Sequence, residues 1–165
     1  MTALPAAERD REQILALLMQ LPAAITVRRG RDLTCTFQNA ASLAVVDQRG
    51  EPLRTTWPDA TPAWLEPYET VLRTGEVVVR REVAATRPTR DGTPRTRYWD
   101  CTYAPLHDDA GAVDGVIIIA DEVTERVETR LRAERAEAER RDAATRLRAA
   151  LGASSTDATA ATSAP

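Results

Sequence analysis

Residues 97–126 read RYWDCTYAPLHDDAGAVDGVIIIADEVTER and contain two strands, a turn and the start of a helix. In residues 95–107 polar and apolar side chains alternate, which is the period of a strand with one buried face. Residues 108–111 are turn formers, and residues 113–120 make a second strand that is almost wholly apolar. Beyond Asp121 no Gly or Pro occurs until Gly152. The segment therefore predicts a strand hairpin that leads directly into a long charged helix.

The N-terminal part of the chain predicts a helix followed by a second hairpin. Residues 6–20 have the apolar spacing of an amphipathic helix, and Pro22 ends it. Residues 23–29 and 33–38 alternate on either side of a Gly-containing turn, which is typical of a β-hairpin.

The middle of the chain predicts helices and one more strand. Residues 39–46 favour a short helix capped by Asn39, and residues 50–62 favour a loop. Residues 62–74 have helical spacing, with Pro67 as an alternative start of that helix. Residues 76–86 predict a strand. Together the elements predict an α+β fold, with short helices on one face of a five-stranded antiparallel sheet.

Four regions follow from this order. They are an N-terminal amphipathic helix (1–21), a sheet domain (22–121), a C-terminal helix able to form a coiled coil (122–151) and a low-complexity tail (152–165) predicted to be disordered. In residues 121–148 basic and acidic residues balance, and several acid–arginine pairs are spaced i,i+4 with the acid first.

Composition narrows the classes of function. The 165 residues hold 22 basic and 25 acidic side chains, a formal net charge of -3, so no nucleic-acid partner is expected. No apolar run reaches the ~18 residues that a membrane span needs. The N-terminus lacks the pattern of a secretory signal, and two cysteines fit a reducing compartment. We expect a cytoplasmic protein.

The closing hairpin resembles that of the PAS family of intracellular sensors. Residues 103–106 (YAPL), the turn at 108–111, Gly115 and the EVTE of 122–125 occur in the order typical of that family. FQNAA at 37–41 and VLRTGE at 71–76 also resemble PAS segments, although the family usually has Asp where this chain has Glu122. The resemblance implies a PAS fold that binds a small ligand under its sheet. It further implies a relay to the exit helix through Asp121, Glu122 and Thr124.

Alternation predicts which side chains share the buried face of the sheet. Thr26, Thr34, Thr36, Arg80, Glu82, Asp100 and Thr102 are assigned to the opposite, outer face. The inner set comprises Ile25, Val27, Leu33, Cys35, Phe37, Val77, Val79, Val83, Trp99, Cys101, Tyr103, Ile117 and Ile119. From these, the candidate ligand pocket is built of Phe37, Val79, Arg81, Trp99, Cys101, Tyr103 and Ile117.

Arg81 interrupts the inner set and allows two interpretations. It could clamp the carboxylate of a ligand, or it could lie in a β-bulge or at a strand end where its side chain reaches solvent. His107 is placed in a surface turn, and Cys35 and Cys101 are interpreted as core thiols. The residues argue against haem and flavin, and they offer no metal-ligand spacing and no catalytic set. No cofactor can be named, and an enzyme is not expected.

Two functions remain open. The first is a sensory module that binds a small ligand or a partner, such as a histidine kinase or phosphatase of a two-component system. The second is a dimerisation or docking scaffold with a filled core. In either case a homodimer is expected, with Leu15, Leu18, Val127 and Leu131 as its candidate interface.

Overall fold

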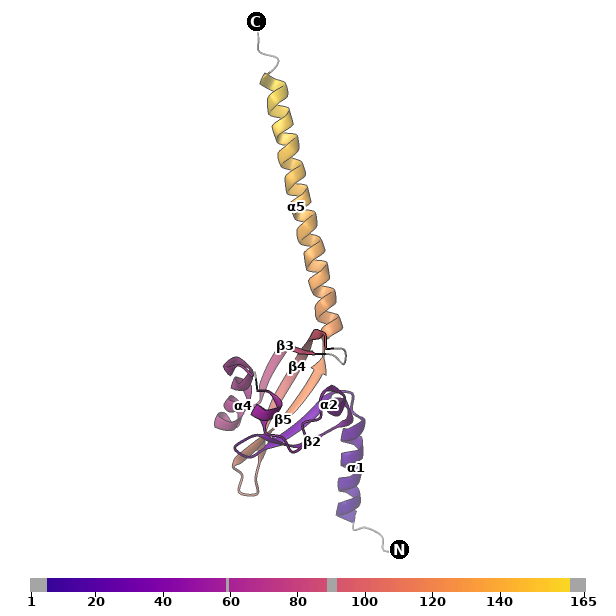
Figure 1. Ribbon diagram of the computed structural model, residues 1–165, viewed down its shortest axis with the longest axis vertical. Helices are drawn as coiled ribbons and strands as arrows, with labels where there is room; N and C mark the ends of the chain where they lie inside the picture. Colours follow the sequence, from indigo (N-terminus) through magenta and orange to yellow (C-terminus); the bar gives the residue numbers. More distant parts are fainter. Residues whose placement is uncertain (1–5, 59, 89–91, 161–165) are drawn as a thin grey trace. The chain divides into compact units, whose positions relative to one another are not determined.

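The computed structural model describes residues 6–58, 60–88 and 92–160. The chain divides into two compact units, Met1–Val123 and Thr124–Pro165. The first unit holds a sheet with its helices, and the second is a single helix, drawn in orange to yellow in Figure 1. Nowhere in the described part of the chain is a helix long and apolar enough to span a membrane.

The sheet has five strands, and every neighbouring pair is antiparallel. The order across the sheet is β2-β1-β5-β4-β3, so the first strand of the chain pairs with the last. The predicted five-stranded antiparallel sheet is confirmed. The strands are β1 (Ala24–Arg29), β2 (Thr34–Gln38), β3 (Val78–Pro88), β4 (Pro94–His107) and β5 (Val113–Glu122).

Four helices belong to the same unit as the sheet (Figure 1). Asn39 caps α2 as predicted, because its side chain accepts a hydrogen bond from the Ser42 backbone N–H. The stretch 50–62, predicted as a loop, contains the short α3. The helix α4 begins at Pro62 with Thr61 as its cap, so the alternative start at Pro67 is wrong. The helices are α1 (Ala6–Gln20), α2 (Ala40–Val45), α3 (Leu53–Thr56) and α4 (Pro62–Thr74).

The hydrophobic core lies between the sheet and the helices α3 and α4. Leu53 comes from α3, and Leu65, Tyr68 and Val71 come from α4. Burying large apolar side chains is the main favourable term in folding, at roughly 1.5–3 kcal/mol each. The sheet and its first turn contribute Leu33, Val78, Cys101, Tyr103, Val116 and Ile118 to this core.

A β-bulge in β3 corrects the predicted inner face. Arg80 pairs with Cys101 and Val83 pairs with Trp99, so two residues of β3 lie opposite the single residue Asp100. The inner face therefore carries even-numbered residues before the bulge and odd-numbered residues after it. Val78 is buried, whereas Val77 and Val79 are 58% and 45% exposed, so their assignment to the core is wrong.

The faces of β1 and β5 are also opposite to the prediction. Val116 and Ile118 lie in the core, and Ile118 pairs with Thr26. Ile25, Val27, Ile117 and Ile119 pair with one another on the outer face; Ile25 is nevertheless buried, whereas Ile119 is exposed. Because both faces of β1 carry buried residues and residues 116–119 are all apolar, alternation could not distinguish the two sides.

The second unit consists of α5 (Thr124–Ala160). This helix follows β5 after the single residue Val123 and begins at Thr124. It continues through Gly152 to Ala160, where a disordered tail was predicted; residues 161–165 lie outside the described part. Of the predicted i,i+4 pairs, Glu137–Arg141 forms an ion pair.

Candidate functional site

A cavity of about 200 Å³ lies on the inner face of the sheet, beneath α2 and α4. One part of its wall is aromatic. The rings of Trp57 and Trp64 are 4.8 Å apart, and Tyr68 lies 5.6 Å from Trp64. Tyr103 of β4 meets Tyr68 edge to face at 5.0 Å. The sheet contributes Trp99 and Cys101 to the same wall.

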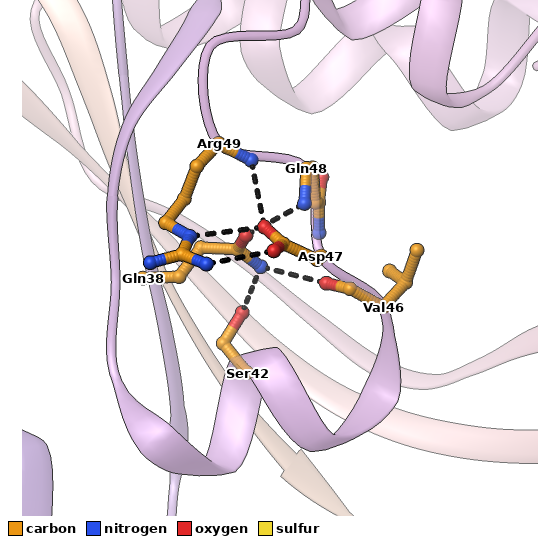
Figure 2. Close-up of polar contacts among 6 residues, drawn as sticks. All are labelled: Gln38, Ser42, Val46, Asp47, Gln48 and Arg49. Carbon is orange, nitrogen blue, oxygen red and sulfur yellow. Dashed lines mark hydrogen bonds and ion pairs between the residues drawn. The ribbon is translucent and has the colours of Figure 1, made fainter.

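The other part of the wall is polar and built from β1, β2 and α2. Gln38 at the end of β2 donates to the Ser42 hydroxyl at 2.7 Å and to the Val46 carbonyl at 3.0 Å (Figure 2). Its side-chain oxygen accepts the Gln48 backbone N–H at 2.8 Å. The hydroxyls of Thr26 and Ser42 are 2.7 Å apart. These bonds hold residues 46–48 against the sheet, and Thr26, Ser42 and Gln48 face the cavity.

The exposed turn beside this wall is closed by an ion pair. Arg49 donates to the Asp47 carboxylate through its Nε at 3.0 Å and Nη2 at 2.7 Å, as Figure 2 shows. These bonds lower the pKa of Asp47 to about 2. The carboxylate therefore stays ionised throughout the physiological range, and the turn stays closed.

Arg28 is the charged residue buried in this wall. Its side chain is among the largest that are fully buried, and the residue is 1% exposed. Its Nη1 donates to the Leu33 carbonyl at 2.7 Å and the Glu51 carbonyl at 3.3 Å, and Nη2 donates to the Gln48 side-chain oxygen. Burial lowers the pKa of Arg28, but a guanidinium remains protonated in proteins. A fixed positive charge therefore lines the cavity.

The buried thiols and phenols in and beside the cavity are neutral at physiological pH. Burial raises the pKa of the Cys101 thiol to about 11 and also raises the pKa values of Tyr68 and Tyr103. Burial likewise raises the pKa of the Cys35 thiol. Both cysteines are free and buried, and little thiolate is present for nucleophilic chemistry. Among the described residues, no cluster of side chains could hold a metal ion.

The structure brings together three of the seven residues predicted for the pocket. Trp99, Cys101 and Tyr103 line the cavity. Three others do not line it. Phe37 pairs with Val27 on the outer face, Val79 is exposed, and Ile118 rather than Ile117 lines the cavity.

Arg81 lies outside the cavity as well. Its side chain is 73% exposed, and its Nη1 donates to the Asp100 carboxylate at 3.0 Å. The bulge interpretation is therefore confirmed, and the carboxylate clamp by Arg81 is wrong. Asp100 also accepts the Glu82 backbone N–H at 2.9 Å, which supports the left-handed conformation of Glu82 (φ 52°).

The sequence interpretation missed the polar wall. Thr26 was assigned to the outer face because it alternates with Ile25 and Val27, and Arg28 shares its parity. The polar pattern of residues 38–48 gave no hint of a site, because Gln and Ser are common in surface turns. Trp57 follows α3, and Trp64 and Tyr68 belong to α4; their rings pack together and also line the cavity.

The residues predicted for relay and for dimerisation have different surroundings. Asp121 pairs with Asp100 and Glu122 with Trp99 across β4 and β5, and Thr124 is buried. Leu15 is exposed, and Leu18 and Leu131 are half-buried. Val127 is only 2% exposed, so it adds little to any outer surface.

Comparisons with known proteins agree with this architecture. The model of the PAS fold matches residues 18–128. Among curated proteins, none matches the chain. Three solved structures that share the fold have low sequence identity to it, so they show the fold alone.

An RNA-binding light-oxygen-voltage receptor superposes with a TM-score of 0.61 at 19% identity over 84% of this chain, which spans only 41% of that receptor. The PAS domain of a Colwellia psychrerythraea protein superposes with a TM-score of 0.55 at 13% identity, over 70% of this chain and 98% of that one. The structure of VqmA bound to DPO superposes with a TM-score of 0.50 at 22% identity, over 68% of this chain and 57% of that one. The strand order, the cavity beneath the helices and the family match over most of the chain lead to one conclusion: this protein belongs to the PAS fold family.

Proposed function

We propose that this chain is a sensory domain whose cavity binds a small molecule and whose C-terminal helix carries the resulting change to a partner. PAS folds are generally sensory rather than catalytic modules. The observation that carries the proposal is the cavity of about 200 Å³, which combines an aromatic wall with an ordered polar wall. Ligand sites typically have this mixture of apolar surface and a few fixed polar groups.

The cavity also favours the sensor over the alternative, a scaffold with a filled core. A filled core would place apolar side chains against the inner face of the sheet, at the packing density of protein interiors. Here Thr26, Ser42 and Gln48 face open space instead. A structural neighbour, VqmA, has been solved bound to DPO, and that precedent favours ligand binding.

A relay would run from the cavity along the hairpin of β4 and β5. Trp99 lines the cavity and pairs with Glu122, the last residue of β5. The next residue, Val123, donates its N–H to the Tyr98 carbonyl at 2.8 Å, and α5 begins immediately after it. A ligand that moves Trp99 would shift this pairing and with it the start of α5. Asp121, Glu122 and Thr124 are the proposed relay residues.

The proposed assembly is a homodimer that acts on a signalling partner such as a histidine kinase or phosphatase. Several apolar side chains of α1 are exposed, among them Ile14, Leu15 and Leu17. An exposed apolar surface of this kind favours self-association. A second copy would cover the exposed side of α1, and the two α5 helices would pair with each other, complete the dimer and connect it to the partner.

Native mass spectrometry of the full chain, as purified, tests ligand binding. We expect a non-covalent adduct that disappears when the same sample is denatured. Ala120→Leu is the cavity variant, because Ala120 lines the cavity and a larger side chain there would fill part of it. It should remain folded by circular dichroism and lose the adduct. Wild-type protein that carries no adduct, and gains none from a small-molecule screen, would favour the scaffold.

A further inference from the structure

We infer that the cavity recognises an anion, a small aromatic carboxylate, through the buried guanidinium of Arg28. This inference rests on the proposed function and specifies its ligand class. It differs from the clamp that was one of two interpretations of Arg81, because Arg28 lies on another strand and its side chain belongs to the cavity wall.

Arg28 makes fewer hydrogen bonds than its guanidinium can donate. A guanidinium has five N–H groups. Three of them are used: two from Nη1 to the carbonyls of Leu33 and Glu51, and one from Nη2 to Gln48. For the Nε–H and the second Nη2–H, no hydrogen bond to any described residue is formed. The Nε–H and the Nη2 N–H on its side form the edge of a guanidinium that binds a carboxylate through both oxygens, and we assign this edge to the ligand.

The positive charge of the site also favours an anionic ligand. The partners of Arg28 are two backbone carbonyls and an amide oxygen, so they solvate its charge without neutralising it. Within the described part of the chain, no carboxylate lies within ion-pair distance of Arg28. Two further arginines, Arg95 and Arg97, line the cavity, and none of the described acidic residues does. A buried charge is costly without a counter-ion, and an anionic ligand would supply one.

The size and shape of the cavity fit a ligand with one aromatic ring. An engineered apolar cavity of about 150 Å³ holds one benzene molecule. The present cavity, at about 200 Å³, has room for one ring and a small polar group. Trp64 and Tyr68 offer ring faces and edges to the same cavity as the polar wall. A single aromatic ring with a carboxylate therefore matches both walls.

Titration calorimetry with two ligands of the same shape tests the inference. Benzoate carries the carboxylate, and benzamide is its neutral counterpart. We expect wild-type protein to bind benzoate at least about tenfold more tightly, because a charge-assisted bidentate pair is much stronger than neutral hydrogen bonds. Equal or tighter binding of benzamide would overturn the anion inference and leave ligand binding itself standing. Binding of neither at millimolar concentration would also overturn it.

Two variants locate the effect. Arg28→Lys keeps the positive charge but removes the fork, so the preference for benzoate should fall to within about threefold. Arg81→Ala removes an arginine of the same sheet domain that lies outside the cavity, and it should bind benzoate as wild type does.

A measurement on wild-type protein covers the case in which Arg28→Lys does not fold. The ¹⁵Nε resonance of Arg28 should shift on addition of benzoate and stay unchanged with benzamide. If that resonance is unmoved while benzoate binds, Arg28 is only a support for residues 48–51, and the inference is wrong.

Discussion

Asn39 shows how one side chain can join three elements at the edge of the site. It is 0% exposed, and its Oδ1 accepts the backbone N–H groups of Ile25 at 2.9 Å and Ser42 at 3.0 Å. Its Nδ2 donates to the Ala23 carbonyl at 2.8 Å. It also donates to the carbonyl of Leu18 in α1 and to that of Leu21 just after this helix. One amide thus satisfies backbone groups of α1, β1 and α2 that would otherwise be buried without partners.

Replacing Asn39 by Ala should lower the free energy of unfolding by about 3 kcal/mol, because buried groups of three elements lose their partner. The matched control is Thr61→Ala, which removes the exposed cap of α4 and its single hydrogen bond to Trp64 at 3.3 Å. That change should cost less than about 1 kcal/mol. Urea denaturation measures both. Equal losses in the two variants would contradict the bridging role of Asn39.

The ion pair of Asp47 and Arg49 makes a prediction about pH. In folded protein the pKa of Asp47 is lowered from 3.8 to about 2 by hydrogen bonds from Arg49. A carboxylate whose folded pKa is depressed contributes stability that is complete above its unfolded pKa and lost as pH falls through the folded one. The turn should therefore loosen between pH 4 and pH 2.

An NMR titration of the Asp47 carboxyl carbon measures this pKa directly. The midpoint should lie near 2 in wild type and return toward 3.8 in Arg49→Ala. A wild-type midpoint at the ordinary value would show that the turn is open in solution.

At the scale of elements, the close approach of β1 and β5 holds Arg28 in place. Gly115 lies opposite Arg29 in this pair, and a Cβ added to it would lie 2.4 Å from the Arg28 carbonyl oxygen. Because that atom belongs to a central strand, it cannot move aside without disturbing the ladder. The absence of a side chain at Gly115 thus allows the strand that carries Arg28 to pair at normal distance.

Gly115→Ala should destabilise the protein by about 2–3 kcal/mol through overpacking against the backbone of β1. Gly50→Ala is the control, since nothing lies within 4 Å of its added Cβ and only its φ of 79° opposes the substitution. That conformational cost is about 1 kcal/mol. Thermal unfolding compares the two variants. A smaller loss in Gly115→Ala than in Gly50→Ala would mean that β1 and β5 pair less tightly than described.

The sequence predicted the elements better than their faces. Alternation, turn glycines and the Asn39 cap are local signals, and they gave the five strands and most helices. The bulge at Arg81 and Glu82 depends on Asp100 of another strand, so the local pattern of β3 offered two interpretations.

The cavity was only partly predictable for a related reason. Trp99, Cys101 and Tyr103 lie on a strand with clear alternation, and all three line it. Arg28 lies on a strand whose two faces are both buried, where apolar Ile25 points away from the cavity. Arg28 could have been found only by considering the polar residues of this strand, as well as its apolar ones, as candidates for the buried inner face.

At the scale of the whole molecule, the chain consists of a sheet domain and a separate helical unit. The cavity, its aromatic wall and the proposed relay hairpin all belong to the first unit. Most of α5 is exposed, including Leu147 and Leu151. Folding and ligand binding should therefore depend on the first unit alone, whereas association should need α5 in addition to α1.

A chain that ends at Glu134 should keep the far-ultraviolet spectrum of the sheet domain and its ligand affinity, but it should be monomeric. A chain that ends at Gly111 lacks β5, which pairs with both β1 and β4, and it should be unfolded. Light scattering at high concentration reads the oligomeric state. A full-length chain that is monomeric under those conditions would contradict the proposed dimer.

The proposed function requires an open, ligand-sized cavity between the inner face of the sheet and the helices α2 and α4. Diffraction from a crystal held under xenon pressure measures it most directly, because xenon occupies preformed cavities with apolar walls. We expect a xenon site bounded by Trp64, Tyr68 and Cys101, with the ring centroids of Trp64 and Tyr68 5.6 Å apart. An unoccupied site, with these side chains closed over the inner face of the sheet, would contradict it.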